Sequence, residues 1–419
     1  MYEEILLKNN LTVVYEKLPY VRSVSFGLWI GTGSRYETPN INGISHFVEH
    51  MLFKGTETKT AKDIAMTIDN IGGQINAFTG KECTCYYTKT LDSDLETGIE
   101  LISDMLFNSR FDPAHIETEK NVIVEEIGMY EDYPEEMVHD MLSEEIWSGN
   151  SLGYPILGNY QTVSDISREN ILDYIKSHYV PENSVISVAG NFDEKQLVEM
   201  VEKYFGGWKS HDYCKVRAYK PWFNSSLKLK RKETEQVHMC LGFRGVKHGE
   251  ESIYSLLALN NILGGGMSSR LFQKVREEMG LAYSIYSYPT SYRDVGMFTI
   301  YAAASPKKYN EVINLIKNEI SNLTHDTISD SDLEKAKNQL KGSYILGLDS
   351  TSSRMNGMGK SQLITGKIRT SDEILESIDK VTIDSVRDVI DYVFRQEQMG
   401  MSAIGDVDFE PGLLNKIAF

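Results

Sequence analysis

Two histidines and a glutamate stand together in the segment HFVEH, as His46, Glu49 and His50. The histidines are four residues apart, so on a helix both imidazoles lie on one face and can bind the same ion. Neutral histidine nitrogens bind zinc at about 2.0–2.1 Å. Zinc lowers the pKa of a water that it binds to about 7, so the carboxylate of Glu49 can take a proton from that water. The segment predicts a metal site with Glu49 as general base, in the inverted order H-x-x-E-H of zinc peptidases.

A catalytic zinc needs a third protein ligand and one open position. From residue 112 to about residue 130 the sequence predicts a helix, on which Glu119, Glu125 and Glu126 compete for this role. Glu119 and Glu126 are two turns apart and share a face with the apolar residues Val122 and Ile123, whereas Glu125 lies on a more polar side. Carboxylates on an apolar stripe need a reason such as a buried cation, so Glu126 is predicted as the third ligand and Glu119 as the partner that orients a ligand histidine. The alternative is that the pattern arose by chance, and a His/Glu site also accepts manganese or cobalt.

Predicted strands and helices must position these residues. Alternation of apolar residues predicts strands at residues 11–16, 23–30 and 74–90. Helical spacing predicts helices at residues 44–53, 61–71 and 95–107, the first of which carries the HFVEH segment.

The second part of the chain resembles the first without its metal chemistry. Residues 237–243 resemble the strand at 24–30, and residues 254–263 align with the helix at 44–53, with Leu256, Leu259 and Asn260 at the three motif positions. This pattern predicts an α+β fold of two homologous half-domains, each a mostly antiparallel sheet packed with helices. The catalytic half is predicted at residues 1–214, a basic linker at 215–232 and a degenerate half at 233–419.

Composition narrows the function classes. The 419 residues are 41% hydrophobic and 25% charged, which is typical of a globular protein. The net charge of −17 argues against nucleic acid as a partner. The first residues carry acids where a signal peptide carries basic residues, so we expect no signal peptide. The sequence has no apolar run of the roughly 20 residues that a membrane span needs, so we expect no membrane partner and a cytoplasmic location. The four cysteines, which form no CxxC pair, are predicted to be buried thiols in a reducing compartment: Cys83, Cys85, Cys214 and Cys240.

The motifs HFVEH-MLFKGT, GGQINAFT and EKNVIVEE together resemble the pitrilysin family, which includes insulin-degrading enzyme and mitochondrial processing peptidase. In length the chain resembles the short bacterial processing-peptidase-like branch of that family. The resemblance implies one zinc ion per chain, bound by His46, His50 and Glu126. It also implies that Glu119 supports a ligand and that Glu49 is the general base.

Two further sets of residues follow from the resemblance. Arg276 and Tyr283 match a pair that contacts the substrate and stabilises its developing oxyanion, for which guanidinium and phenol are suitable donors. The alternatives are a surface charge for Arg276 and a core aromatic for Tyr283. Asn76, Ala77 and Phe78 match a strand that binds the peptide as an added strand, and the alternative is an ordinary sheet strand.

The predicted function is a zinc-dependent endopeptidase that hydrolyses unstructured peptides or presequence-like segments. Because longer relatives carry four such half-domains around a chamber, the resemblance implies a homodimer here. The alternative is a non-catalytic peptide-binding or scaffold subunit of a peptidase complex.

Two segments invite other interpretations. The glycine-rich loop at residues 264–270 lacks the spacing of a phosphate-binding loop, which argues against nucleotide binding. The acidic segment at residues 131–136 is predicted to be a solvated loop, and a preference for basic peptides is the alternative.

Overall fold

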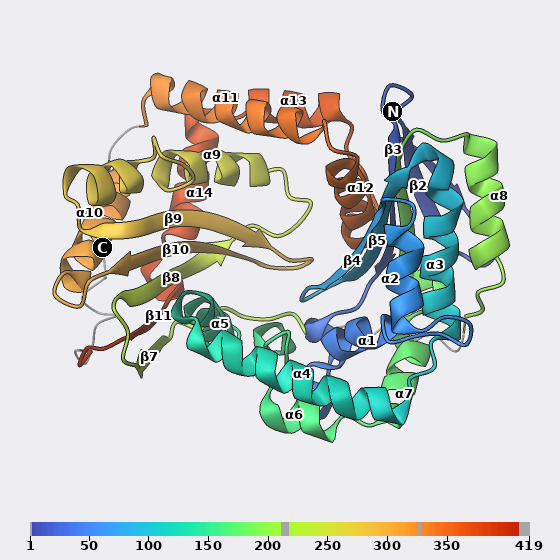
Figure 1. The fold of residues 1–419 in the computed structure, drawn as a ribbon. Coiled ribbons are helices and arrows are strands. Elements are labelled where there is room, and N and C mark those ends of the chain that lie inside the picture. The colour runs from blue at the N-terminus through green and yellow to red at the C-terminus, as the bar shows by residue number, and fades with distance from the viewer. Residues whose placement is uncertain (1, 211–217, 326–327, 410–419) are drawn as a thin grey trace. The chain divides into compact units, whose positions relative to one another are not determined.

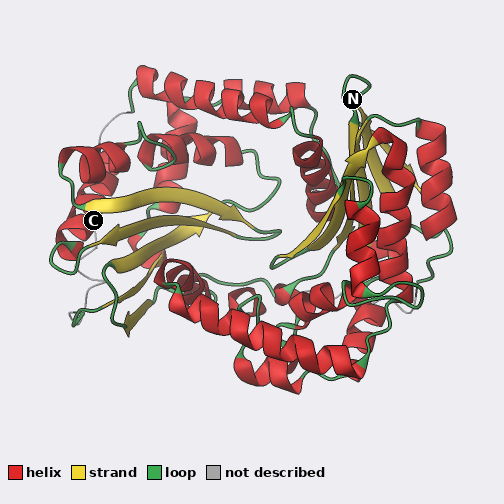
Figure 2. Cartoon of the chain, in the orientation of Figure 1, coloured by secondary structure: helices red, strands yellow, loops and turns green. Residues whose placement is uncertain are grey.

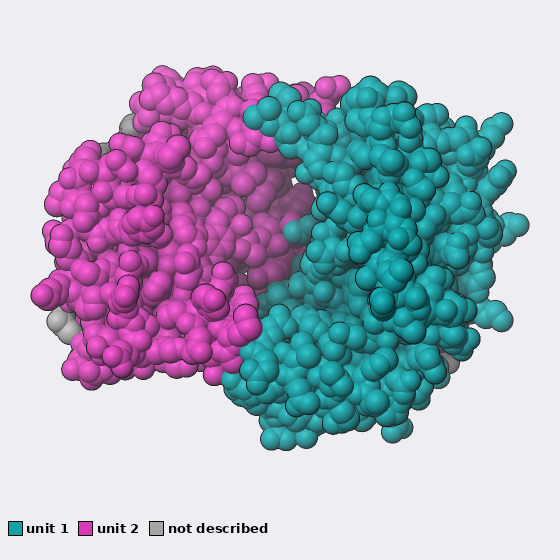
Figure 3. Space-filling view, in the orientation of Figure 1, with its two compact units in different colours: residues 1–127, 154–218, 345–370 teal, residues 128–153, 219–344, 371–419 magenta. Residues whose placement is uncertain are grey.

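The computed structural model describes residues 2–210, 218–325 and 328–409. The chain forms two compact units, coloured separately in Figure 3. Unit 1 comprises residues 1–127, 154–218 and 345–370, and unit 2 comprises residues 128–153, 219–344 and 371–419. Each unit contains one sheet and several helices (Figures 1 and 2), and the predicted α+β fold is confirmed.

The sheet of unit 1 has the strand order β1-β2-β6-β3-β5-β4. Only β2 and β6 pair in parallel, with Thr12 opposite Val185, and the other neighbours are antiparallel. The strands are β1 Glu3–Leu6, β2 Thr12–Lys17, β3 Ser23–Ile30, β4 Gln74–Thr79, β5 Thr84–Leu91 and β6 Ser184–Gly190.

The sheet of unit 2 repeats this topology in the order β7-β11-β8-β10-β9. β7 pairs in parallel with β11, as β2 does with β6 in unit 1. The strands β8, β10 and β9 then follow with antiparallel pairing, as β3, β5 and β4 do in unit 1. The shared order supports the internal duplication that the sequence suggests. The strands are β7 Leu227–Arg231, β8 Val237–Gly245, β9 Ala282–Ser291, β10 Gly296–Ala304 and β11 Met399–Gly405.

The helices follow one another in a similar order in both halves of the sequence. In the first half they are α1 Ile44–Leu52, α2 Ala61–Asp69, α3 Leu95–Asn108, α4 Pro113–Asp132, α5 Pro134–Ile146, α6 Tyr160–Asp165, α7 Arg168–His178 and α8 Glu194–Phe205. In the second half they are α9 Ile253–Leu263, a π-helical segment Phe272–Glu278, α10 Tyr309–His325, α11 Asp330–Gly347, α12 Thr351–Thr365, α13 Ser371–Asp379 and α14 Ile383–Val393.

One helix from each half of the sequence packs in the unit of the other half. α12 lies against β2, β3 and β6 in unit 1, and α5 lies against β8 and β11 in unit 2. A glycine in an inner strand permits each approach, because a Cβ on Gly27 would lie 2.3 Å from Met355 Sδ and a Cβ on Gly242 would lie 2.5 Å from Ile146 Cδ1. The predicted halves, residues 1–214 and 233–419, follow the order of the chain, whereas each compact unit takes in a helix from the other half.

The predicted linker at 215–232 contains a strand, because residues 227–231 form β7. Its first residues, 215–217, and Cys214 lie outside the described residues. Cys83, Cys85 and Cys240 are free and buried, as predicted for them. The acidic segment 131–136 is not a loop: it ends α4 and begins α5, and its Glu135 and Glu136 are exposed in the first turn of α5.

Candidate metal centre

α1 carries both motif histidines and is anchored by its apolar face. Phe47, Val48 and Met51 are buried in the core of unit 1. Their burial fixes the opposite part of the helix, where the rings of His46 and His50 lie on adjacent turns with centroids 4.5 Å apart. His46 is 8% exposed and His50 is half-buried, so α1 presents two imidazoles beside each other at the margin of the core.

α4 adds a carboxylate to the two imidazoles. Glu126 Oε2 lies 3.8 Å from His46 Nε2 and 3.8 Å from His50 Nε2. Within residues 2–210, 218–325 and 328–409, these three side chains are the one set of histidine, cysteine, aspartate or glutamate residues whose ligand atoms come close enough together to hold a metal ion. The structure therefore brings the three predicted ligands together.

The apolar face of α4 differs in part from the predicted one. Val122, which the sequence placed on the apolar stripe, is 45% exposed, while the buried stripe of α4 consists of Ile116, Glu119, Ile123 and Ile127. Glu119 belongs to this stripe, and Glu126 lies beside it, half-exposed.

The donor set fits zinc. Ligand atoms bound to one zinc at about 2.0–2.1 Å in tetrahedral geometry lie roughly 3.4 Å apart, close to the 3.8 Å separations seen here. Burial, with the charge of His50 as a second cause, lowers the pKa of His46 to about 3. This imidazole is therefore neutral at pH 7, as a metal ligand must be. Two imidazole nitrogens and one carboxylate oxygen form a ligand set of catalytic zinc.

Glu49 lies on α1 between the histidines and contacts the sheet. The hydroxyl of Thr79, the last residue of β4, donates a hydrogen bond to Glu49 Oε2. Burial raises the pKa of Glu49, while the hydrogen bond from Thr79 and the charge of His50 act in the opposite direction. A buried carboxylate with a raised pKa is a better proton acceptor than an exposed one, which suits a general base.

Glu119 holds the far side of one histidine. Its Oε2 lies 3.1 Å from His50 Nδ1, and its Oε1 lies 2.7 Å from the ammonium nitrogen of Lys54. Glu119 is 3% exposed, so Lys54 supplies the positive charge that a buried carboxylate requires. A carboxylate that accepts the second N–H of a metal-binding histidine fixes its tautomer and ring orientation.

Asn76, Ala77 and Phe78 lie on β4, which forms one edge of the sheet in unit 1. Ala77 N donates to the side-chain oxygen of Asn76 at 2.8 Å, and Gly80 N, directly after β4, donates to Cys83 O at 2.8 Å, on the side of β5. By the alternation of antiparallel pairing, the backbone groups of Ile75, Ala77 and Thr79 therefore point to the free edge. Among the described residues no strand occupies that edge. The edge of β4 is available to an added strand.

Arg276 and Tyr283 belong to unit 2 and lie together. The guanidinium carbon of Arg276 is 5.0 Å from the centre of the Tyr283 ring. Tyr283 is 72% exposed, which excludes the alternative of a core aromatic. Arg276 lies in the π-helical segment Phe272–Glu278, and such irregular helices often occur at functional sites.

Lys54 and Thr79 contact the site residues although the sequence does not predict a role for them. Both lie in the motif segments MLFKGT and GGQINAFT. Thr79 lies two residues after Ala77 in the strand, so the two side chains lie on the same face of the sheet. Nothing in the sequence indicates that this face meets Glu49, because that contact joins elements 30 residues apart.

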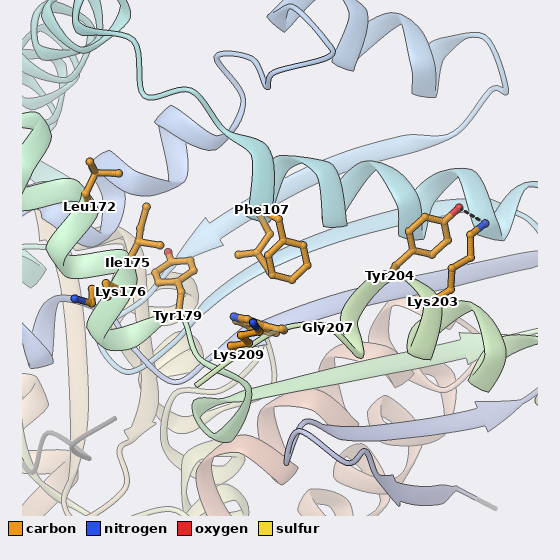
Figure 4. A pocket seen from close by; sticks show the side chains of 11 residues that line it. Phe107, Leu172, Ile175, Lys176, Tyr179, Lys203, Tyr204, Gly207 and Lys209 are labelled. Atoms are coloured by element: carbon orange, nitrogen blue, oxygen red, sulfur yellow. Dashed lines mark hydrogen bonds between the residues drawn. The ribbon is translucent and has the colours of Figure 1, made fainter. Parts of the chain in front are cut away.

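A pocket of about 540 Å³ lies elsewhere in unit 1, between α3, α7 and α8 (Figure 4). Phe107, Ile175 and Trp208 contribute apolar walls, and Lys176 and Lys209 lie at its margin. None of the predicted site residues lines it. No helix in the described part of the chain is long and apolar enough to cross a membrane.

Known proteins resemble the chain along most of its length. The family description "Insulinase (Peptidase family M16)" matches residues 12–159, and "Peptidase M16 inactive domain" matches residues 165–340. The uncharacterized zinc protease YmxG of Bacillus subtilis is 46% identical over 397 residues, which cover 95% of this chain and 97% of that protein. An uncharacterized zinc protease of Streptomyces coelicolor is 40% identical over 390 residues, which cover 91% of this chain and 85% of that protein.

Solved structures share the fold. A protease from Helicobacter pylori superposes with a TM-score of 0.91 at 21% identity, over 97% of this chain and 99% of that one. A peptidase M16 inactive domain from Pseudomonas fluorescens has the same TM-score at 16% identity, over 98% of this chain and 99% of that one.

Proposed function

The chain belongs to the pitrilysin-like insulinase family (peptidase family M16), and on that premise we propose that it is a zinc-dependent endopeptidase acting on unstructured peptides or presequence-like segments. One observation carries the proposal: the ligand atoms of His46, His50 and Glu126 all lie within 4.8 Å of one another, beside the buried carboxylate of Glu49 on the same helix as the histidines. Ligands and base are thus present together in one unit.

The residues divide the work of hydrolysis among them. His46, His50 and Glu126 would hold one zinc ion per chain, and zinc when bound supplies a Lewis acid for the scissile carbonyl and makes water more acidic. Glu49 accepts a proton from the attacking water and passes it to the leaving amine. Thr79 orients the carboxylate of Glu49 through its hydroxyl.

The free edge of β4 supports peptide binding by strand addition. Its outward backbone groups pair with any extended segment, whatever the side chains, which suits an enzyme that cuts many sequences. Phe78 is 38% exposed and packs edge-on against Trp29 at 5.4 Å, which gives a substrate side chain an aromatic surface to contact. Folded substrates do not present a free strand, so unstructured peptides are the preferred class.

The half-buried Arg276 and the exposed Tyr283 support a homodimer in which each chain contributes these donors to its partner's metal site. In a homodimer of the Glu49→Gln chain both sites lack the base, and in a homodimer of the Arg276→Ala chain both sites lack the donor. A heterodimer of the two should regain part of the activity, because the site of the Arg276→Ala chain then has its own Glu49 and receives an intact Arg276 from the other chain. Confirmed heterodimers without any recovery would contradict the arrangement.

The free, buried thiols support a reducing compartment such as the cytoplasm. Cell fractionation that recovers the protein outside the cytoplasm would contradict this location.

The test of the proposed function compares wild-type protein with Glu49→Gln on a mixed library of unstructured peptides, with zinc content measured for both. We expect cleavage by the wild type alone and equal zinc in both, since Glu49 is not a ligand. Full zinc without cleavage by either protein would instead favour the alternative, a peptide-binding or scaffold subunit.

A further inference from the structure

A second buried carboxylate, Glu37, contacts the start of the metal helix α1. Its Oε2 accepts from Gly43 N and from Asn42 Nδ2, each at 2.8 Å, and its Oε1 accepts from Ser45 N at 2.9 Å. Glu37 is 5% exposed. Both carboxylate oxygens are thus committed to donors at or next to the first turn of α1.

α1 depends on this carboxylate because it has no cap of its own. The residue at its N-cap position is Gly43, with φ of 98° and no side chain to accept the free N–H groups of the first turn. A negative charge at a helix N-terminus is also favourable to the helix dipole. Glu37 therefore replaces the missing cap and fixes the chain where α1 begins.

The two metal-binding histidines are held differently. His50 Nδ1 lies 3.1 Å from Glu119, whereas His46 Nδ1 is buried with no hydrogen-bond partner among the described residues. Metal-binding histidines usually donate their second N–H to an acceptor that sets the ring orientation. The ring of His46 lacks that support, so its position depends on the backbone that carries it, one residue beyond Ser45.

The duplicated half provides an internal comparison. α9 corresponds to α1 but has no metal ligands, and its first two N–H groups, Ile253 N and Tyr254 N, donate to the backbone carbonyls of Glu250 and Glu251. Glu250 and Glu251, which precede α9, are not buried. A buried carboxylate is therefore not required to start this helix in this fold, and it occurs in the half that has the metal ligands.

We infer that Glu37 is a positioning residue of the metal site: by anchoring Asn42, Gly43 and Ser45 it sets the location of His46 and thereby the affinity for zinc. The inference rests on the proposed function insofar as that function assigns zinc to His46, His50 and Glu126. It adds a residue that contacts neither zinc nor substrate and acts through the backbone of α1.

The test measures the zinc dissociation constant of metal-stripped protein by competition with a chromophoric chelator, together with the melting temperature of the apo-protein. Glu37→Gln keeps the size of the side chain but turns an NH₂ group toward backbone donors, so we expect zinc binding to weaken by about 10- to 100-fold, as for other supporting contacts of metal ligands. The control is Asp104→Asn, a carboxylate in unit 1 that is 8% exposed and accepts hydrogen bonds without touching α1; its donors are Thr56, Thr58, Lys59 and Asn108. It should lower the melting temperature and leave zinc affinity within threefold of wild type.

Zinc binding by folded Glu37→Gln within threefold of wild type would overturn the inference. If Glu37→Gln does not fold, Asn42→Ala decides, because it removes one of the three donors: we expect at least threefold weaker zinc binding, and an unchanged constant would overturn the inference. Cleavage is not part of this measurement, so a wild type that binds zinc but cuts no peptide would defeat the peptidase proposal alone. A wild type that binds no zinc would overturn both.

Discussion

Two glycines of α12 offer a sharp test of the packing of this helix in unit 1. A Cβ on Gly359 would lie 2.2 Å from Nε1 and 2.5 Å from Cδ1 of Trp29, whereas a Cβ on Gly357 would meet nothing within 4 Å. The two positions are two residues apart in the same helix. Gly359→Ala and Gly357→Ala therefore make the same chemical change, once against a buried indole and once against solvent.

The expected energies follow from these contacts. In the interior of a helix, alanine is favoured over glycine by about 1 kcal/mol, and both variants gain this amount. Ordinary contact begins at 3.4 Å, so Gly359→Ala must displace Trp29 by roughly 1 Å. Trp29 is 1% exposed in a cluster with Met355 and Met358, and overpacking of this kind costs about 1–3 kcal/mol.

The difference between the two variants isolates the contact, because the propensity gain cancels. We expect the free energy of unfolding, measured with urea, to be about 1–3 kcal/mol lower for Gly359→Ala than for Gly357→Ala. Gly357→Ala itself should be at least as stable as wild type. Equal stability of the two variants would refute the close approach of α12 to β3.

Three further predictions concern the site. In metal-free protein, His46 has a pKa of about 3 in the folded state and of about 6.5 in the unfolded state. Between these two pH values the unfolded chain binds more protons than the folded protein, so the free energy of unfolding decreases as the pH falls below about 6.5. Burial also lowers the pKa of His139, to about 4, so both proteins lose stability, but from pH 7 to pH 5 the wild type should lose about 2 kcal/mol more than His46→Gln by urea titration. An equal pH dependence of stability in the two proteins would contradict the assignment. Lys54→Met removes the ammonium that pairs with Glu119 and should weaken zinc binding by about 10- to 100-fold in a chelator titration. The surface variant Lys62→Met should bind zinc as the wild type does. Equal zinc dissociation constants for Lys54→Met and wild type would show that Lys54 does not support the site. Ala77→Pro removes one outward N–H from the edge of β4, where proline is tolerated, and should raise KM roughly two- to tenfold at unchanged zinc content; an unchanged KM would argue against strand addition there.

Much of the fold could be predicted because its signals are local. The apolar spacing of residues 44–53 and the alternation of residues 74–90 predict α1 and the hairpin of β4 and β5, which the structure contains. β7 falls within the predicted linker because residues 215–232 are polar and basic and include Pro221. In β7 only Leu227 and Leu229 pack against the core of unit 2, and lysines alternate with them. The charge of Lys228 is balanced by Glu144 on α5, 2.6 Å away, and such a partner is invisible in the strand's own sequence.

The packing of α5 and α12 could not be predicted, because no local pattern states which sheet a helix covers. α12 presents Met355 and Gly359 to β3, and its buried set is too mixed to indicate an apolar face of the usual kind. The same limit applies to the site. HFVEH predicts the two histidines and the base, but the contacts of Glu37, Lys54 and Thr79 depend on where turns and strand ends meet α1.

The duplicated half shows how little of a metal site is due to the scaffold. Leu256 and Leu259 replace His46 and Glu49 in the alignment and are both fully buried in the core of unit 2. Asn260, in place of His50, accepts a hydrogen bond from Ser287 at 2.7 Å. α9 thus uses for packing the positions that α1 uses for ligands, although the order and pairing of the surrounding strands are the same. The sheet fixes where the helix lies. A metal site also requires polar residues on that helix, a carboxylate from α4 and groups that hold each ligand in place. The two halves differ in these features.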